Sequence, residues 1–195
     1  MVLRHFCVVR LTIRSAGPLL RVAMMQQYSE RQSGRRGFDG LIPLTPIGLV
    51  DRTHVVVDLE NLCGGSDSVS ARSAGTYRAL TEVIPFHRSQ VVVAVGVNAW
   101  SQSPMLGFEW PQARFLVGRG INGADLRLVE DLIDEPQAQR SARVVIASGD
   151  GLFAEPALRL RSRGISVSVV AVAHSLSHRL REAASEVLYL PHVAA

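Results

Sequence analysis

The stretch His54-Val-Val-Val-Asp-Leu-Glu-Asn-Leu62 decides how the rest of the chain is interpreted. Its three valines predict a strand over 55–57 that ends at Asp58. A short run that is apolar at every position is typical of a parallel strand buried on both faces. The acid that follows stands at the edge of a low-dielectric core, where a carboxylate is poorly placed for stability. Asp58 is therefore the first candidate for a functional residue.

Strands and helices alternate along the chain after this stretch. We expect further strands at 91–95, 114–117, 144–147, 165–172 and 187–190, with helices at 70–84, 124–133, 152–163 and 175–184. This alternation predicts an α/β fold made of parallel βαβ units. Because right-handed crossovers are nearly obligatory, the units should form a doubly wound, mostly parallel sheet with helices on both faces. In such sheets the functional residues lie at the carboxyl ends of the strands.

The charges divide the chain into two parts. Residues 1–50 hold seven arginines against two acids, whereas residues 51–195 hold fourteen arginines against fifteen acids. The segment from 26 to 51 is rich in Gln, Ser, Gly, Arg and Pro and shows no period. We therefore expect a basic, flexible, disordered N-terminal extension over 1–52 and a folded domain over 53–195. The extension could add salt-sensitive phosphate contacts, or it could be a solvated leader without a role in binding.

The composition excludes several classes of protein. The chain contains no lysine, which removes phosphate-loop ATPases, Schiff-base enzymes and pyridoxal-phosphate enzymes. Cys7 and Cys63 are far apart, so a disulfide framework or a structural zinc site is not expected, and a reducing compartment, the cytoplasm, fits. No apolar run approaches the ~20 residues of a membrane helix. We expect no membrane partner.

Three acids fall where the topology places functional residues. Asp58 ends the first strand, Asp150 follows the strand at 144–147 across a Ser-Gly turn, and Asp125 begins a helix. Converging carboxylates repel one another and need a cation, and hard oxygen ligands favour Mg²⁺ or Mn²⁺. Such an ion can activate water for attack on a phosphodiester. Each acid also has a structural interpretation, as a turn cap, a helix N-terminal acid or an N-cap.

Three strings of the sequence, in order, resemble the motifs of NYN domains, a nuclease family of the PIN-like superfamily. The stretch 54–62 resembles the opening strand and D-x-x-N motif of that family. Gly123-Ala-Asp-Leu-Arg-Leu-Val-Glu-Asp131 is similar to its central G-x-D-x-x-L-x-x-D segment. Val144-Val-Ile-Ala-Ser-Gly-Asp150, with Phe153, Pro156 and the strand after Gly164, is similar to its S-G-D-x-D-F-x-P-L motif. The resemblance covers residues 53–190.

The resemblance implies a PIN-like fold and a metal-dependent endoribonuclease that hydrolyses RNA phosphodiester bonds. Asp58, Asp125 and Asp150 match the family's catalytic, metal-binding acids, and the implied cofactor is Mg²⁺ or Mn²⁺. Asn61 and Ser148 match supporting residues and are expected, with Arg119, on the substrate side of the site. The implied partner is RNA, single-stranded or structured, and a homodimer is an allowed assembly.

Two departures from the family pattern leave an alternative open. Leu152 stands where the family often has a second acid, and Asn122 stands where it often has a lysine, so that Arg119 would have to contact phosphate instead. The alternative is a catalytically degenerate NYN domain that binds RNA or protein. Asp131 lies six residues, about 240° of helix, after Asp125 and need not share its face. A dinucleotide-binding enzyme is disfavoured because no G-x-G-x-x-G follows a strand.

The two tryptophans, Trp100 and Trp110, fall in what we expect to be a long loop between the strands at 91–95 and 114–117. Tryptophan can stack on unpaired bases. It can equally pack beneath such a loop as part of the core.

Overall fold

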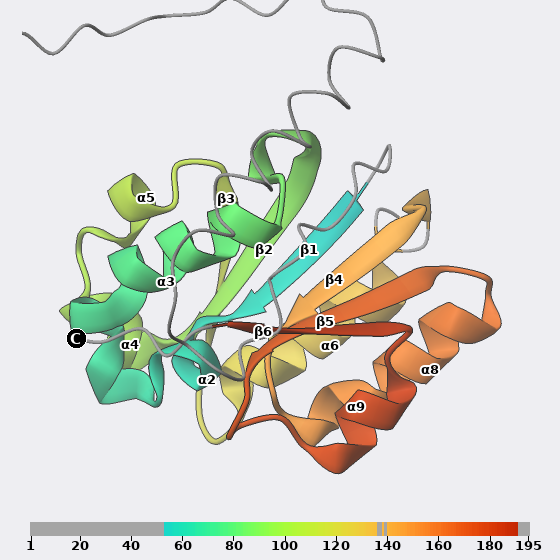
Figure 1. Ribbon diagram of the computed structural model, residues 1–195. Coiled ribbons are helices and arrows are strands. Elements are labelled where there is room, and N and C mark those ends of the chain that lie inside the picture. Colours follow the sequence, from blue (N-terminus) through green and yellow to red (C-terminus); the bar gives the residue numbers. More distant parts are fainter. Residues whose placement is uncertain (1–52, 136–137, 139, 191–195) are drawn as a thin grey trace, which may run out of the picture. The chain divides into compact units, whose positions relative to one another are not determined.

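The computed structural model describes residues 53–135, 138 and 140–190, which form a six-stranded sheet with helices on both sides (Figure 1). The extension expected over 1–52 lies outside the described residues. The strands are β1 (Thr53–Asp58), β2 (Ser89–Gly96), β3 (Ala113–Gly118), β4 (Arg143–Ala147), β5 (Ser166–Val172) and β6 (Glu186–Leu190).

The order of the strands in the sheet is β3-β2-β1-β4-β5-β6, and each neighbouring pair is parallel. This confirms the doubly wound α/β fold predicted from the sequence, with every predicted strand present. The strand order reverses between β1 and β4. In doubly wound sheets such a reversal opens a crevice beyond the carboxyl ends of the two strands, where ligands bind.

The longer helices occupy the predicted positions, and three short ones are new. The helices are α2 (Leu59–Cys63), α3 (Val69–Val83), α4 (Val97–Gln102), α5 (Leu106–Glu109), α6 (Gly123–Asp134), α8 (Ala154–Ser162) and α9 (His178–Ala183). Short 3₁₀ turns lie at η1 (Ser66–Ser68), η2 (Phe86–Arg88) and η3 (Gly151–Phe153). The expectation of a loop around Trp100 was wrong, because α4 and α5 lie there. Both helices are too short to show a helical period in the sequence.

The sheet separates two hydrophobic cores. Val55 and Val57 of β1 point into the layer formed with α2, α3, α4 and α5, whereas Val56 points into the layer formed with α6, α8 and α9. Figure 1 shows α3 and α5 on one side of the sheet and α6, α8 and α9 on the other. All six residues of β1 are buried, which agrees with the unbroken apolar run in its sequence. Among the described helices, none is long and apolar enough to span a membrane.

Candidate functional site

A cavity of about 350 Å³ lies at the carboxyl edge of the sheet, beside the point where the strand order reverses. The three acids selected from the sequence all line it, and each comes from a different part of the chain. The lining residues are Asp58, Glu60, Asn61, Gly64, Gly65, Ser66, Asp125 and Asp150. The topology therefore brings together carboxylates that lie up to 92 positions apart in the sequence.

Asp58 is held by hydrogen bonds at both carboxylate oxygens. Its Oδ1 accepts a hydrogen bond from the backbone N–H of Asn61 over 3.1 Å, which makes Asp58 the N-cap of α2. Its Oδ2 accepts from the hydroxyl of Ser148 over 2.8 Å, and both groups are buried. The capping role that the sequence suggested for Asp58 is thus real. Asp58 therefore both caps α2 and lines the cavity.

Ser148 and Asn61 connect the ends of β1 and β4. The hydroxyl oxygen of Ser148 accepts a hydrogen bond from the backbone N–H of Asp150 over 3.1 Å. The side-chain carbonyl of Asn61 accepts from the N–H of Gly149 over 2.9 Å. Both residues therefore position the acids through hydrogen bonds, and Asn61 also lines the cavity.

The turn that carries Asp150 depends on the glycine before it. A Cβ atom at Gly149 would stand 2.3 Å from the backbone oxygen of Ser175, in the loop after β5, so no larger residue fits. Asp150 then caps η3, since its Oδ1 accepts from the N–H of Leu152 over 2.8 Å. The predicted N-cap is confirmed, although it caps the short 3₁₀ turn rather than α8.

Asp125 reaches the cavity because α6 begins directly against the end of β3. A Cβ atom at Gly118 would lie 2.1 Å from the backbone nitrogen of Ala124, so only glycine allows this close approach. Asn122, just before the helix, has φ of 54°, in the left-handed region. The loop between β3 and α6 thus closes tightly and places Asp125 in the first turn of the helix.

The crowding of acids changes how two of them titrate. Burial, together with the nearby charges of Asp125 and Asp150, raises the pKa of Asp58 to about 7, although the hydrogen bonds from Asn61 and Ser148 act in the opposite direction. Burial also raises the pKa of Asp125 to about 6, helped by repulsion from Asp150 and Glu60 and opposed by a hydrogen bond to Asp58. At neutral pH the full ionisation of these carboxyl groups is therefore unfavourable without a positive charge in the cavity.

Glu60 is a cavity acid that the sequence interpretation missed. Its Oε1 accepts a hydrogen bond from the backbone N–H of Gly96, at the end of β2, over 3.0 Å. The signal was present in the sequence, because Glu60 follows Asp58 by two residues at the same edge of the sheet.

The donor set of this cavity suits a hard divalent cation. Four carboxylates supply oxygen ligands of the kind that Mg²⁺ and Mn²⁺ prefer. Within 53–135, 138 and 140–190, however, no three His, Cys, Asp or Glu side chains stand in the geometry of a finished metal site. A cation bound by three of these groups therefore requires at least one carboxylate to rotate towards the others.

Two residues singled out from the sequence lie outside the cavity. Arg119 is exposed on the loop between β3 and α6, where the described residues offer it no ion pair. Leu152, at the position where the family often has an acid, contributes its backbone N–H to Asp150 and no oxygen ligand. The cavity consequently has no cationic side chain among its lining residues.

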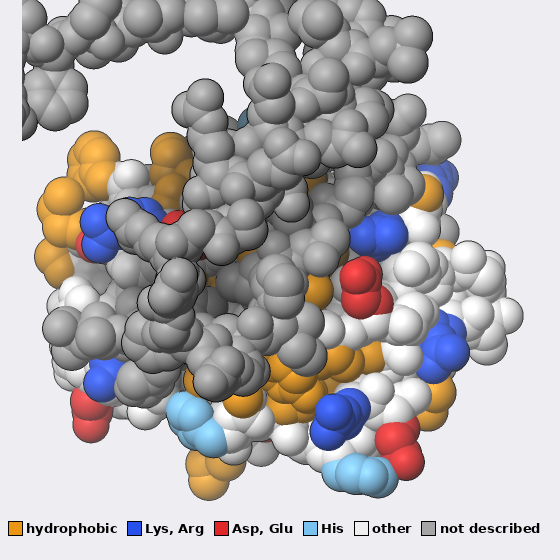
Figure 2. Space-filling model, in the orientation of Figure 1, with side chains coloured by type: hydrophobic (Ala, Val, Ile, Leu, Met, Phe, Trp, Pro, Cys, Tyr) orange, Lys and Arg blue, Asp and Glu red, His pale blue; other side chains and the backbone are white. Residues whose placement is uncertain are grey.

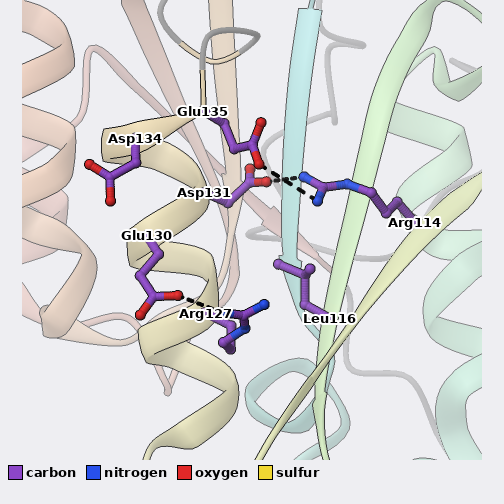
Figure 3. Close-up of a pocket in the computed structure, with 7 residues that line it drawn as sticks. All are labelled: Arg114, Leu116, Arg127, Glu130, Asp131, Asp134 and Glu135. Atoms are coloured by element: carbon purple, nitrogen blue, oxygen red, sulfur yellow. Dashed lines mark hydrogen bonds and ion pairs between the residues drawn. The ribbon is translucent and has the colours of Figure 1, made fainter.

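Asp131 lies in a different cavity, of about 380 Å³, between α6 and β3 (Figure 3). Its Oδ2 stands 2.6 Å from Nε2 of His54, and its Oδ1 accepts a hydrogen bond from the guanidinium of Arg114. Figure 3 shows Arg114 extending from β3 towards Asp131 and Glu135. The helical spacing indicated that Asp131 need not share the face of Asp125, and the two residues line different cavities. Asp131 connects the C-terminal part of α6 to His54 on β1 and Arg114 on β3.

Comparison with known proteins points to one family. The family model described as NYN domain matches residues 52–191. A crystal structure of a protein of unknown function from Vibrio parahaemolyticus is similar, with a TM-score of 0.53 and 18% identity, covering 74% of this chain and 97% of that one. At this identity the similarity shows the fold alone. No curated protein matches the chain.

Proposed function

The chain belongs to the NYN domain family of PIN-like ribonucleases, and from this premise we propose that it is a metal-dependent endoribonuclease. It would hydrolyse RNA phosphodiester bonds at the cavity that Asp58, Glu60, Asp125 and Asp150 line.

One observation carries the proposal. Separate elements bring four carboxylates to one cavity, and burial and mutual repulsion raise the pKa of both Asp58 and Asp125. An arrangement that costs stability in the free protein is typical of a functional site. A divalent cation would offset the repulsion and keep the acids ionised at neutral pH.

The residues of the site would have three roles, which are metal binding, positioning of the acids and phosphate binding. Asp58, Asp125 and Asp150, with Glu60, would hold Mg²⁺ or Mn²⁺, which when bound supplies an activated water and stabilises charge on the phosphate oxygens. Ser148 and Asn61 fix the carboxylate of Asp58 and the turn before Asp150. Arg119, the exposed cation nearest in sequence to Asp125 on the N-terminal side, would contact a phosphate of the bound strand.

Cleavage of a labelled RNA by purified protein tests the proposal. We expect cleavage in Mn²⁺ or Mg²⁺, none in EDTA, and a loss of at least about 100-fold in Asp58→Asn and Asp150→Asn. Asp134→Asn is the matched control, because Asp134 is an exposed acid of α6 that lines the other cavity. The proposal fails if the folded Asp58→Asn and Asp150→Asn variants cleave as fast as the parent.

A second candidate function is an NYN domain that binds RNA or protein without cutting. Leu152 favours it, because this position supplies no acid and the described side chains form no finished metal site. Calorimetric titration with Mn²⁺ separates the candidates. A nuclease should bind the ion at the cavity and lose that binding in Asp150→Asn, whereas a degenerate domain should not bind it in either form.

A further inference from the structure

The two tryptophans of the chain have different environments. Trp110 is 1% exposed, its Nε1 donates a hydrogen bond to the hydroxyl of Ser73 over 2.8 Å, and its ring packs edge-on against Tyr77. Trp100 is 37% exposed and lies on α4, with its ring centroid 5.0 Å from that of Phe115 on β3. Trp110 is thus a core residue. Trp100 presents part of an indole to solvent over a supporting aromatic ring.

Trp100 lies on the β3 side of the acidic cavity. Its helix, α4, begins directly after Gly96, whose N–H donates to Glu60 in the cavity. Gly96 in turn pairs with Gly118, the last residue of β3 and the residue against which the first turn of α6 packs. A short series of contacts therefore joins the indole, the end of β3 and the acids.

The end of β3 and the loop after it carry exposed apolar and cationic side chains. Val117 lies two residues after Phe115 on the same face of β3 and is 37% exposed. Ile121, in the loop that leads to Asp125, is 92% exposed. Arg119 is exposed in the same loop. Phe115 on β3 supports the exposed indole, and Arg119 follows the last residue of β3 by one position. An exposed aromatic ring that packs on β3 and a cation just after the end of β3 suit a nucleotide, whose base can stack and whose phosphate is negatively charged.

We propose that Trp100, supported by Phe115, is a stacking platform for one unpaired base of the RNA, beside the site of cleavage. The inference rests on the proposed function, because it assigns a base-binding subsite to the same carboxyl edge of the sheet that holds the acidic cavity. Two strand spacings of roughly 4.8 Å separate β3 from β1, so the platform takes a nucleotide near the scissile phosphate rather than the one attacked. Because a base in a duplex is already stacked, the bound strand must be unpaired there.

Because Trp100 is exposed and Trp110 is buried, tryptophan fluorescence can test the proposal. In EDTA, where metal-dependent cleavage cannot occur, a single-stranded oligoadenylate should quench the fluorescence of Trp100 and leave that of Trp110 unchanged. Trp100→Phe should bind nearly as well as the parent but lose the quenching. Trp100→Ala should bind about tenfold more weakly. An oligonucleotide with abasic sugars should show the weaker binding even with the parent protein.

The matched control is Phe108→Ala. Phe108 is also an exposed aromatic residue, but it lies on α5, which leads into the amino end of β3, whereas Trp100 lies on α4, which begins at the carboxyl end of β2. Its removal should leave RNA binding unchanged. Circular dichroism and thermal melting of each variant establish that it is folded.

Three results would overturn the proposal. They are equal RNA affinity in Trp100→Ala and the parent, equal affinity for intact and abasic strands, or a dimer, detected by sedimentation, that Trp100→Ala dissociates. The last result would assign the surface to a second copy of the chain. Since the assay needs neither metal nor cleavage, quenching through Trp100 in a protein that never cuts RNA would refute the nuclease and retain the platform.

Discussion

The hydroxyl of Ser148 donates a hydrogen bond to Oδ2 of Asp58 over 2.8 Å, although 90 positions separate the two residues in the chain. The bond joins the ends of β1 and β4 where the strand order reverses. It fixes the orientation of a buried carboxylate.

Ser148→Ala should weaken both stability and cation binding. The substitution removes the donor to Asp58 and the acceptor for the N–H of Asp150, so we expect a loss of about 1–3 kcal/mol in the free energy of unfolding. Urea denaturation and Mn²⁺ calorimetry measure the two effects. Ser162→Ala, which removes only an exposed hydrogen bond to Arg159, should change neither. An unaltered Mn²⁺ affinity in Ser148→Ala would contradict the proposed role of this bond.

The protein without metal should lose stability as the pH rises from about 4 to about 7. The folded-state pKa values of Asp58 and Asp125, about 7 and about 6, lie above the ordinary value of 3.8. The folded protein therefore binds more protons than the unfolded chain in this interval, and deprotonation favours unfolding. Urea denaturation in EDTA at pH 5 and pH 7.5 should show the difference.

Mn²⁺ should counteract the loss of stability at higher pH. A bound cation stabilises the ionised carboxylates, so the metal should raise the melting temperature more at pH 7.5 than at pH 5. Equal shifts at both pH values, or a metal-free protein more stable at pH 7.5, would contradict the electrostatic description of the cavity. A magnesium titration should give the same direction.

Asp125→Asn should stabilise the metal-free protein while weakening the site. The amide removes the repulsion with Asp150 and Glu60, and because Asp125 is only half-buried we expect a gain on the order of 1 kcal/mol at pH 7.5. Mn²⁺ affinity should fall at the same time. Asp134→Asn on the same helix serves as the control for both measurements. A destabilised Asp125→Asn with unchanged Mn²⁺ binding would mean that Asp125 serves the fold alone.

Asp131→Asn should have the opposite effects to Asp125→Asn: it should destabilise the protein and leave Mn²⁺ binding unchanged. Asp131 is buried and contacts both His54 and Arg114. Its loss removes the carboxylate that faces His54 and the nearer of the two that face Arg114, at a cost of about 3 kcal/mol. Because Asp131 lines a different cavity, Mn²⁺ affinity measured well below the melting temperature should stay unchanged. Glu130→Gln, which breaks only an exposed pair with Arg127, is the control. Impaired metal binding in Asp131→Asn would show that the two cavities are coupled.

The sequence was sufficient for the sheet and for the three aspartates because both depend on local patterns. The valines of β1 are apolar without interruption since the strand is buried on both faces. The acids follow strand ends, and parallel topology brings strand ends to one edge. Motif resemblance gave the same residues independently, and the family match agrees with it.

Other features could not be predicted because they depend on contacts between distant residues. Trp100 and Trp110 occupy similar positions in the sequence. Trp110 is buried through contacts with distant residues, among them the hydrogen bond to Ser73, 37 positions earlier, and the edge-on contact with Tyr77. Glu60 joins the cavity through Gly96, and α2, α4 and α5 are too short to leave a period. The boundary at residue 52, the cytoplasmic location and the homodimer stay predictions.

The reversal of strand order between β1 and β4 also determines when the site can first exist during synthesis. Asp58 and Asp125 are synthesised before β4, and the turn that carries Asp150 is synthesised after it. Until that turn docks beside β1, a nascent polypeptide has no complete set of acids. If the protein is a ribonuclease, it therefore cannot attack the messenger that encodes it until that turn has been synthesised and has docked beside β1.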